Sequence, residues 1–238
     1  MTDLPHHDVT GSGPVLLLVP GGAGHPMGLD PLTERLATRF TVVTYDPLGL
    51  AHGRLGRPVP EQRPADWSEG ARRVLEAVLP AGEAAYVFGT SSGGIATLDL
   101  LARHPGRLAH VVAHEPPCVT VLPDGEALRA ELIEQLDGPG RPPAEGESAT
   151  PTGVFLARVL RPFSSYVPAV TPPPGRLTIA VGADSRGLLL DRTAEALAER
   201  LGSARAVFPG GHLGTLDHPV EFADRLTETL RSSARTSA

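Results

Sequence analysis

Short apolar runs alternate with amphipathic stretches along most of this chain. Residues 15–19, Val-Leu-Leu-Leu-Val, form a continuous apolar run that ends in Pro-Gly-Gly, a pattern typical of a strand buried on both faces. The same alternation predicts further strands at residues 41–45, 84–88, 108–113, 177–181 and 204–208, with helices at 30–40, 67–79, 93–104, 188–201 and 219–230. Strands separated by helices predict an α/β fold, a three-layer sandwich around a mostly parallel sheet.

The alternation is interrupted between residues 117 and 175. This segment is rich in proline, and its sequence predicts helices at 125–136 and 153–160. A length of 238 residues fits one domain, so we expect a single domain over residues 1–238 that carries 117–175 as an insertion between two strands.

The basic residues exclude several kinds of chemistry. All 21 cations are arginine, and the absence of lysine excludes a Schiff-base lysine, a P-loop lysine and a Ser–Lys nucleophile pair. Nucleic-acid binding relies on clustered cations that contact phosphates, and this chain has a net charge of −6 and no lysine. No nucleic-acid partner is therefore expected.

The single cysteine, Cys118, leaves no partner for an internal disulfide. No Cys/His spacing matches a zinc site, and we expect neither a metal nor another cofactor. The N-terminus lacks the basic and apolar regions of a signal peptide, and His6 and His7 are expected to lie in a frayed tail. No apolar run approaches the roughly 18 residues of a membrane helix, so we expect a cytoplasmic protein without a membrane partner.

The sharpest motif is Gly-Thr-Ser-Ser-Gly-Gly at residues 89–94. It follows the predicted strand 84–88 directly and opens the predicted helix 93–104, the context of a nucleophile elbow. Such a turn is tight and strained, and the glycines around Ser91 provide positions without bulk. The alternative is a Gly-rich connection without chemistry. The context favours Ser91 as a nucleophile at a helix N-terminus, where negative charge is stabilised.

A second Gly-rich loop, Pro-Gly-Gly-Ala-Gly at residues 20–24, follows the first strand. In an acyl-transfer site this loop would direct the N–H of Gly22 at an oxyanion, beside the N–H of Ser92. A dinucleotide-binding loop also lies between a strand and a helix. Reading from Gly22, its G-x-G-x-x-G pattern requires glycine where the chain has Met27, so that pattern fails.

Nine histidines are candidates for a general base. His212 differs from the others because Pro-Gly-Gly-His at 209–212 lies in a loop after the last strand and before the last helix. Glycines there allow the imidazole to lean over the carboxyl edge of the sheet, where Ser91 is expected. A lone histidine is often structural, but this position favours catalysis.

With this order of parts, the chain resembles small capped bacterial members of the α/β-hydrolase family over nearly its full length. The residues that carry the resemblance are the elbow at Ser91, the segment His-Glu-Pro-Pro at 114–117 and Gly-Gly-His-Leu-Gly at 210–214. The resemblance implies that Ser91 is the nucleophile, His212 the base, and residues 117–175 a cap. The chain departs from the family pattern at its start, because about a dozen residues precede the first strong strand, and we expect the N-terminal antiparallel strands to be truncated.

Two positions are candidates for the acid of a triad. The family's usual acid lies at the third residue after a Gly that follows the next-to-last strand, where this chain has Ser185, with Asp184 one residue earlier. The family's other location is the end of the preceding strand, where this chain has Glu115. Either carboxylate could orient His212. The register favours Glu115 slightly, and both remain open.

The resemblance implies hydrolysis of an ester or related acyl bond in a small, mainly apolar substrate. His25 and the cap residues Leu132, Phe155 and Phe163 are candidate substrate-binding residues, although the cap residues are equally explained as the buried faces of two helices. Two alternatives remain: a non-hydrolytic lyase, cyclase or isomerase with the same fold, and a binding protein with an idle triad.

Overall fold

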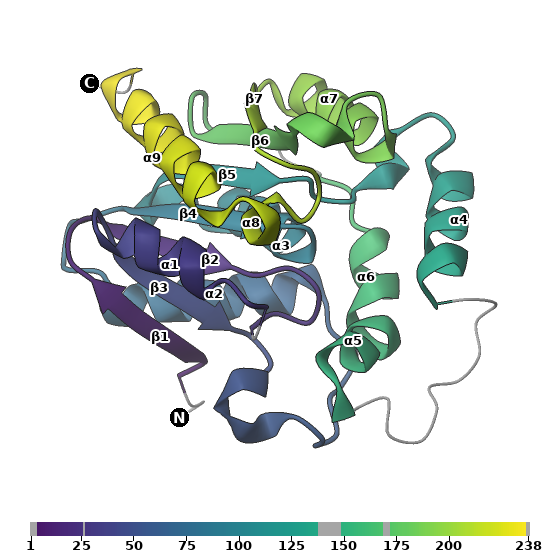
Figure 1. The fold of residues 1–238 in the computed structure, drawn as a ribbon, viewed down its shortest axis with the longest axis horizontal. Coiled ribbons are helices and arrows are strands. Elements are labelled where there is room, and N and C mark those ends of the chain that lie inside the picture. The colour runs from purple at the N-terminus through teal and green to yellow at the C-terminus, as the bar shows by residue number, and fades with distance from the viewer. Residues whose placement is uncertain (1–3, 26, 138–148, 169–171, 237–238) are drawn as a thin grey trace.

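The computed structural model describes residues 4–25, 27–137, 149–168 and 172–236. Seven strands form one sheet with the order β1-β3-β2-β4-β5-β6-β7 (Figure 1). The strands are β1 (His6–Gly11), β2 (Val15–Val19), β3 (Thr41–Asp46), β4 (Ala85–Thr90), β5 (Leu108–His114), β6 (Leu177–Gly182) and β7 (Ala204–Phe208). The principal helices are α1 (Asp30–Ala37), α2 (Pro64–Val78), α3 (Ser92–Arg103), α4 (Gly125–Asp137), α7 (Leu189–Leu201) and α9 (Pro219–Thr236).

The predicted α/β sandwich is confirmed, and strands β2 to β7 run parallel to one another. The edge strand β1 is antiparallel to β3, with His6 paired to Asp46 and Gly11 to Thr41. The expectation that His6 and His7 lie in a frayed tail is therefore wrong. Most side chains of β1 are exposed, so the strand lacks the apolar pattern by which the others were recognised.

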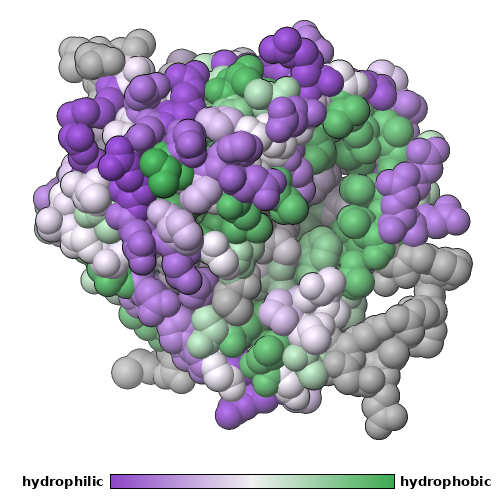
Figure 2. All heavy atoms as spheres, in the orientation of Figure 1, coloured by the Kyte–Doolittle hydropathy of each residue, from purple (hydrophilic) through white to green (hydrophobic). Residues whose placement is uncertain are grey.

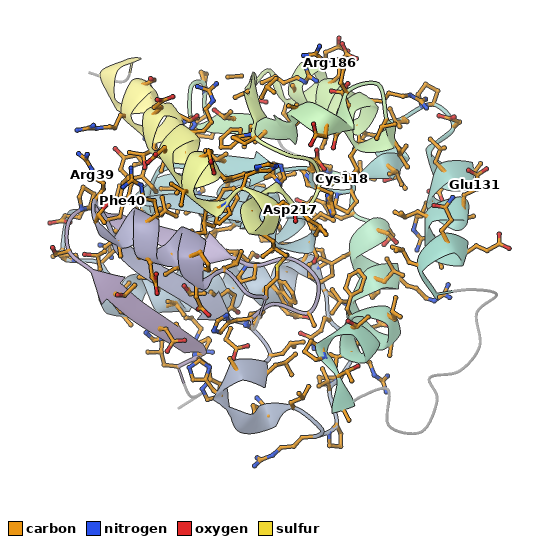
Figure 3. The ribbon with its side chains drawn as sticks, in the orientation of Figure 1. Arg39, Phe40, Cys118, Glu131, Arg186 and Asp217 are labelled. Atoms are coloured by element: carbon orange, nitrogen blue, oxygen red, sulfur yellow. The ribbon has the colours of Figure 1, made fainter. Side chains whose placement is uncertain are left out.

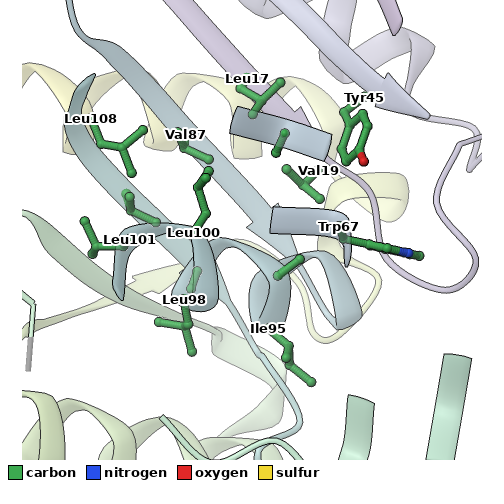
Figure 4. Close-up of a cluster of buried hydrophobic side chains, with 14 of the residues drawn as sticks. Leu17, Val19, Tyr45, Trp67, Val87, Ile95, Leu98, Leu100, Leu101 and Leu108 are labelled. Carbon is green, nitrogen blue, oxygen red and sulfur yellow. The ribbon is translucent and has the colours of Figure 1, made fainter. Parts of the chain in front are cut away.

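Helices cover both faces of the sheet because its central strands are apolar on both sides. Leu16 and Leu18 of β2 pack with α1 and α9, whereas Leu17 and Val19 pack with α2 and α3 on the opposite face. All four side chains are nearly inaccessible to solvent, as expected for a buried parallel strand. Figure 4 shows the second of these clusters, which lies between the strands and helix α3.

The predicted insertion lies between β5 and β6. It contains α4, α5 (Pro151–Val154) and α6 (Leu160–Ser164), and Figure 1 shows these helices beside the ends of the parallel strands. Its second half shares the main hydrophobic core: the Phe163 ring lies 4.8 Å from the Trp67 ring of α2, measured between centroids. Helix α4 is tied to α6 because Arg129 donates to the Ser164 hydroxyl at 3.2 Å.

Figure 3 shows the two sides of this insertion. Glu131 lies on the side of α4 that faces away from the sheet, and Cys118 lies where the insertion leaves the sheet. None of the helices in the described ranges is both long and apolar enough to span a membrane.

Candidate active site

Ser91 lies in the turn between β4 and α3, as the elbow motif predicts. Its φ of 54° is in a region that non-glycine residues rarely adopt, so the turn stores strain. The chain crosses closely here: a Cβ added to Gly93 would lie 1.9 Å from the carbonyl oxygen of Val19. A side chain at position 93 would therefore push the elbow away from β2, which explains the glycine that follows the two serines.

His212 reaches Ser91 from the loop after β7. Its Nε2 lies 3.1 Å from the Ser91 Oγ, within hydrogen-bond distance. Gly210, with a φ of 74°, supplies the backbone conformation that turns the loop back over the sheet. About a third of the His212 side chain is exposed, so the ring borders solvent on one side and the serine on the other.

Glu115 is the carboxylate that contacts the imidazole. His212 Nδ1 lies 2.9 Å from Glu115 Oε2. Thr90 of β4 and His114 of β5 are paired in the sheet, so Ser91 and Glu115 are the next residues of two neighbouring strands. They are also the two non-glycine residues with positive φ among those described, Glu115 having a φ of 43°.

The other candidate acid, Asp184, lies in a short turn after β6 and is exposed. Its backbone N–H donates to the carbonyl of Gly210 at 3.0 Å. No hydrogen bond or ion pair within the described part of the chain joins its carboxylate to His212. The geometry thus brings Ser91, His212 and Glu115 together and leaves Asp184 outside.

The Glu115 carboxylate is fully buried and held by several donors. The backbone N–H of Gly182 donates to Oε1 at 2.8 Å, and the Ser185 hydroxyl also bonds to the carboxylate. Burial raises the pKa of Glu115, but the hydrogen bonds from His212, Ser185 and Gly182 outweigh it and hold the pKa below its usual range. Glu115 is therefore ionised at neutral pH.

Ser185 and the Gly182 amide were not identified as functional from the sequence. The signal for Ser185 was its register, because it stands at the third position after Gly182, where the family resemblance led us to expect an acid. In this chain that position supplies a hydrogen-bond donor to the Glu115 carboxylate, which follows the neighbouring strand. Ser185 is itself buried, with a relative exposure of 5%.

His114, the last residue of β5, directly precedes Glu115, and its ring packs against α9. Its ring is fully buried against Phe222, with centroids 5.0 Å apart, and its Nδ1 lies 3.2 Å from the Thr90 hydroxyl. Burial lowers the pKa of His114 to about 4, so this ring is neutral at pH 7. His114 adds no positive charge next to Glu115 and His212.

The predicted oxyanion residues lie on either side of the serine. Ser92 is the first residue of α3, at the helix N-terminus, and Gly22 lies in the loop after β2 with a φ of 58°. The two are linked directly, since the Ser92 hydroxyl donates to the Gly22 carbonyl at 2.9 Å. A Cβ added to Gly21 would lie 2.8 Å from the Ser91 Cβ, so the loop is in contact with the nucleophile.

The candidate substrate-binding residues are dispersed. Phe163 is 1% exposed and packs in the main hydrophobic core. The His25 Nε2 lies 3.6 Å from Asp8 of β1, and the residue lines a cavity of about 280 Å³ between β1 and α1 rather than the space above Ser91. Leu132 and Phe155 are half-buried on the insertion.

Cys118 is fully buried, and burial raises the pKa of its thiol far above the usual range. This environment is that of an inert structural cysteine. In the portion of the chain that the structure describes, no group of three or more His, Cys, Asp or Glu residues is placed to hold a metal ion.

Comparison with known proteins is consistent with this geometry. Residues 16–225 match the model of the alpha/beta hydrolase family. The chain is 31% identical over 255 residues to the uncharacterized hydrolase YraK of Bacillus subtilis, covering 97% of this chain and 93% of that protein. It is 25% identical over 250 residues to the zearalenone hydrolase of Bionectria ochroleuca, covering 95% and 93% of the two chains.

A thermophilic esterase from Thermogutta terrifontis has a similar structure, with a TM-score of 0.69 and 20% sequence identity over 96% of this chain and 93% of that one. The family match spans most of the sequence and includes both the elbow and His212. The chain is therefore an enzyme of the alpha/beta hydrolase family.

Proposed function

We propose that this enzyme is a serine hydrolase that cleaves an ester or related acyl bond of a small, mainly apolar substrate through an acyl-enzyme. The observation that carries the proposal is the continuous hydrogen-bonded series from Ser91 through His212 to Glu115, at 3.1 and 2.9 Å. Nucleophile, base and orienting acid are each within hydrogen-bond distance of the next, which is the arrangement that activates a serine.

In the first step the Ser91 Oγ attacks the substrate carbonyl carbon while His212 Nε2 takes the hydroxyl proton. Glu115 keeps the proton of His212 on Nδ1 and stabilises the imidazolium that forms. The carbonyl oxygen becomes negatively charged and accepts hydrogen bonds from the N–H groups of Gly22 and Ser92. The bond to the leaving alcohol then breaks, and the imidazolium returns the proton to the alcohol oxygen.

In the second step a water molecule replaces the alcohol. His212 takes a proton from the water, whose oxygen attacks the acyl carbon bonded to Ser91. The second tetrahedral intermediate uses the same two N–H groups, and it collapses when His212 protonates the Ser91 oxygen. The products are a carboxylic acid and the free enzyme.

The apolar character of the substrate is inferred from the insertion. Figure 2 shows hydrophobic residues gathered around the hollow that separates the insertion from the rest of the domain. Leu132 and Phe155 are half-buried on the insertion, so part of each remains exposed. The zearalenone hydrolase among the relatives and the esterase among the similar structures support the same class of reaction.

A fluorophosphonate probe tests the nucleophile. The probe should attach to the Ser91 Oγ of the folded enzyme, as located by peptide mass spectrometry, and should fail to attach to the Ser91→Ala variant. The same preparation should release nitrophenol from short-chain p-nitrophenyl esters. Attachment without turnover would favour a non-hydrolytic enzyme of this fold, and absence of labelling in the folded protein would contradict an activated serine.

A further inference from the structure

The loop that carries Gly22 is unusually rich in glycine for a segment that has to hold a fixed position. Glycines occupy positions 21, 22, 24 and 28, and glycine loses more conformational freedom on ordering than any other residue. An oxyanion site works only when its donors are already in place before the charge forms. A loop of this composition therefore needs specific contacts to keep the N–H of Gly22 in place.

Two sets of contacts hold the start of the loop. Gly21 lies against the Ser91 side chain, and its N–H donates to the Met27 sulfur at 3.2 Å. The N–H of Gly24 closes a turn on the Gly21 carbonyl at 2.9 Å. Neither set of contacts fixes the carbonyl of Gly22, which determines how the peptide after Gly22 is oriented.

The Ser92 side chain provides that contact. Its hydroxyl donates to the Gly22 carbonyl at 2.9 Å, and Ser92 is 2% exposed. Among the residues described, this is the one hydrogen bond that joins the elbow turn to the loop of residues 21–25. It links the two residues whose N–H groups face the oxyanion in the proposed mechanism.

We propose that Ser92 is a positioning residue: by holding the Gly22 carbonyl, its hydroxyl fixes the peptide that follows Gly22. This limits rotation about the Gly22 backbone, and so keeps the N–H of Gly22, in the preceding peptide, directed at the oxyanion. This inference rests on the proposed function. Ser92 contributes twice: its backbone N–H contacts the oxyanion, and its side chain orients the second donor. Because the negative charge develops only in the transition state, the side chain should affect turnover rather than substrate affinity.

The test compares three variants with the wild-type enzyme. Ser92→Ala removes the hydroxyl and keeps the backbone N–H, while Ser92→Thr keeps a hydroxyl. The matched control is Thr97→Val, because the Thr97 hydroxyl makes a similar bond, to the Gly94 carbonyl at 2.8 Å on the same helix, but does not contact the loop.

For p-nitrophenyl acetate, Ser92→Ala should lower kcat by about tenfold with KM unchanged, as expected for the loss of one hydrogen bond. Ser92→Thr should recover most of this loss, and Thr97→Val should retain wild-type kcat. An unchanged kcat in Ser92→Ala, or an equal loss in Thr97→Val, would overturn the positioning role.

Hydrogen–deuterium exchange separates this inference from the proposed function. In the resting enzyme, Ser92→Ala should increase exchange in residues 20–28 relative to Thr97→Val. Unchanged exchange in this loop overturns the proposed hydrogen-bond restraint whether or not esters are cleaved. If the wild-type protein neither reacts with fluorophosphonate nor cleaves esters, the proposed function fails, while the exchange experiment still decides whether Ser92 holds the loop.

Discussion

Replacing Glu115 by Gln exchanges one carboxylate oxygen for an NH₂ group. In the native enzyme that carboxylate accepts hydrogen bonds from three donors. His212 Nδ1, the Gly182 amide and the Ser185 hydroxyl all bond to the carboxylate in the native enzyme. The amide oxygen of glutamine cannot accept from all three, so its NH₂ must face one of them. Two orientations are therefore possible, and each has a measurable consequence.

If the NH₂ faces His212, the imidazole must accept on Nδ1 and carry its proton on Nε2. The ring then cannot take the proton of Ser91, and kcat should fall by about 10⁴, or about 5 kcal/mol in activation free energy. If the NH₂ faces Gly182 instead, a buried N–H loses its acceptor. The free energy of unfolding should then fall by about 1–3 kcal/mol. In both orientations His212 loses the charge that stabilises its imidazolium, so we expect kcat to fall by at least about 10³.

The assay is steady-state hydrolysis of a p-nitrophenyl ester, with the concentration of folded protein as the enzyme concentration. Urea unfolding of each variant separates lost catalysis from lost folding. The matched control is Asp184→Asn, which removes an exposed carboxylate from the neighbouring turn and should keep kcat within about twofold. A small and equal effect of both substitutions would refute the triad. A large loss in Asp184→Asn alone would make Asp184 the acid.

Three further outcomes are expected. Phe163→Ala should lower the free energy of unfolding by about 3–5 kcal/mol because the ring is buried in the core. The KM for short esters should not change, and a selective rise in KM would instead indicate that Phe163 binds substrate. Ser185→Ala removes a donor that lowers the pKa of Glu115. The stability from a depressed carboxyl pKa is present above the unfolded-state pKa and is lost as pH falls through the folded-state pKa. Urea unfolding should therefore show a deficit of about 2 kcal/mol at pH 7 that narrows in acid. The hydrogen bond to Asp46 raises the pKa of His52, which stabilises the fold below the unfolded-state pKa and is lost as pH rises through the folded-state pKa. His52→Gln should therefore lower the urea midpoint more at pH 5.5 than at pH 8.5, and a deficit independent of pH would contradict this coupling.

The parallel strands and their helices could be predicted because burial on both faces leaves a continuous apolar run. Residues 15–19, for example, coincide with β2, in which every residue is buried. The edge strand β1 could not be found in this way. It pairs with β3 through its backbone while most of its side chains face solvent, so its sequence carries no apolar periodicity.

The site was predicted as far as it depends on chain order. Ser91 and His212 follow strands and adjoin glycines, and both features are visible in the sequence. Which carboxylate contacts His212 depends instead on backbone geometry, because Glu115 reaches the imidazole from a backbone with a φ of 43°. Similarly, the spacing of Phe163 marks the apolar face of a helix but does not reveal that this face packs on Trp67.

The position of Glu115 has a consequence for how such an enzyme diversifies. Ser91 and Glu115 follow two directly paired strands, so the sheet itself sets their separation. The turn after β6 supplies supporting hydrogen bonds and no reacting group, and its residues from 186 to 188 are exposed. This surface can accept substitutions or insertions without displacing the charged partner of His212.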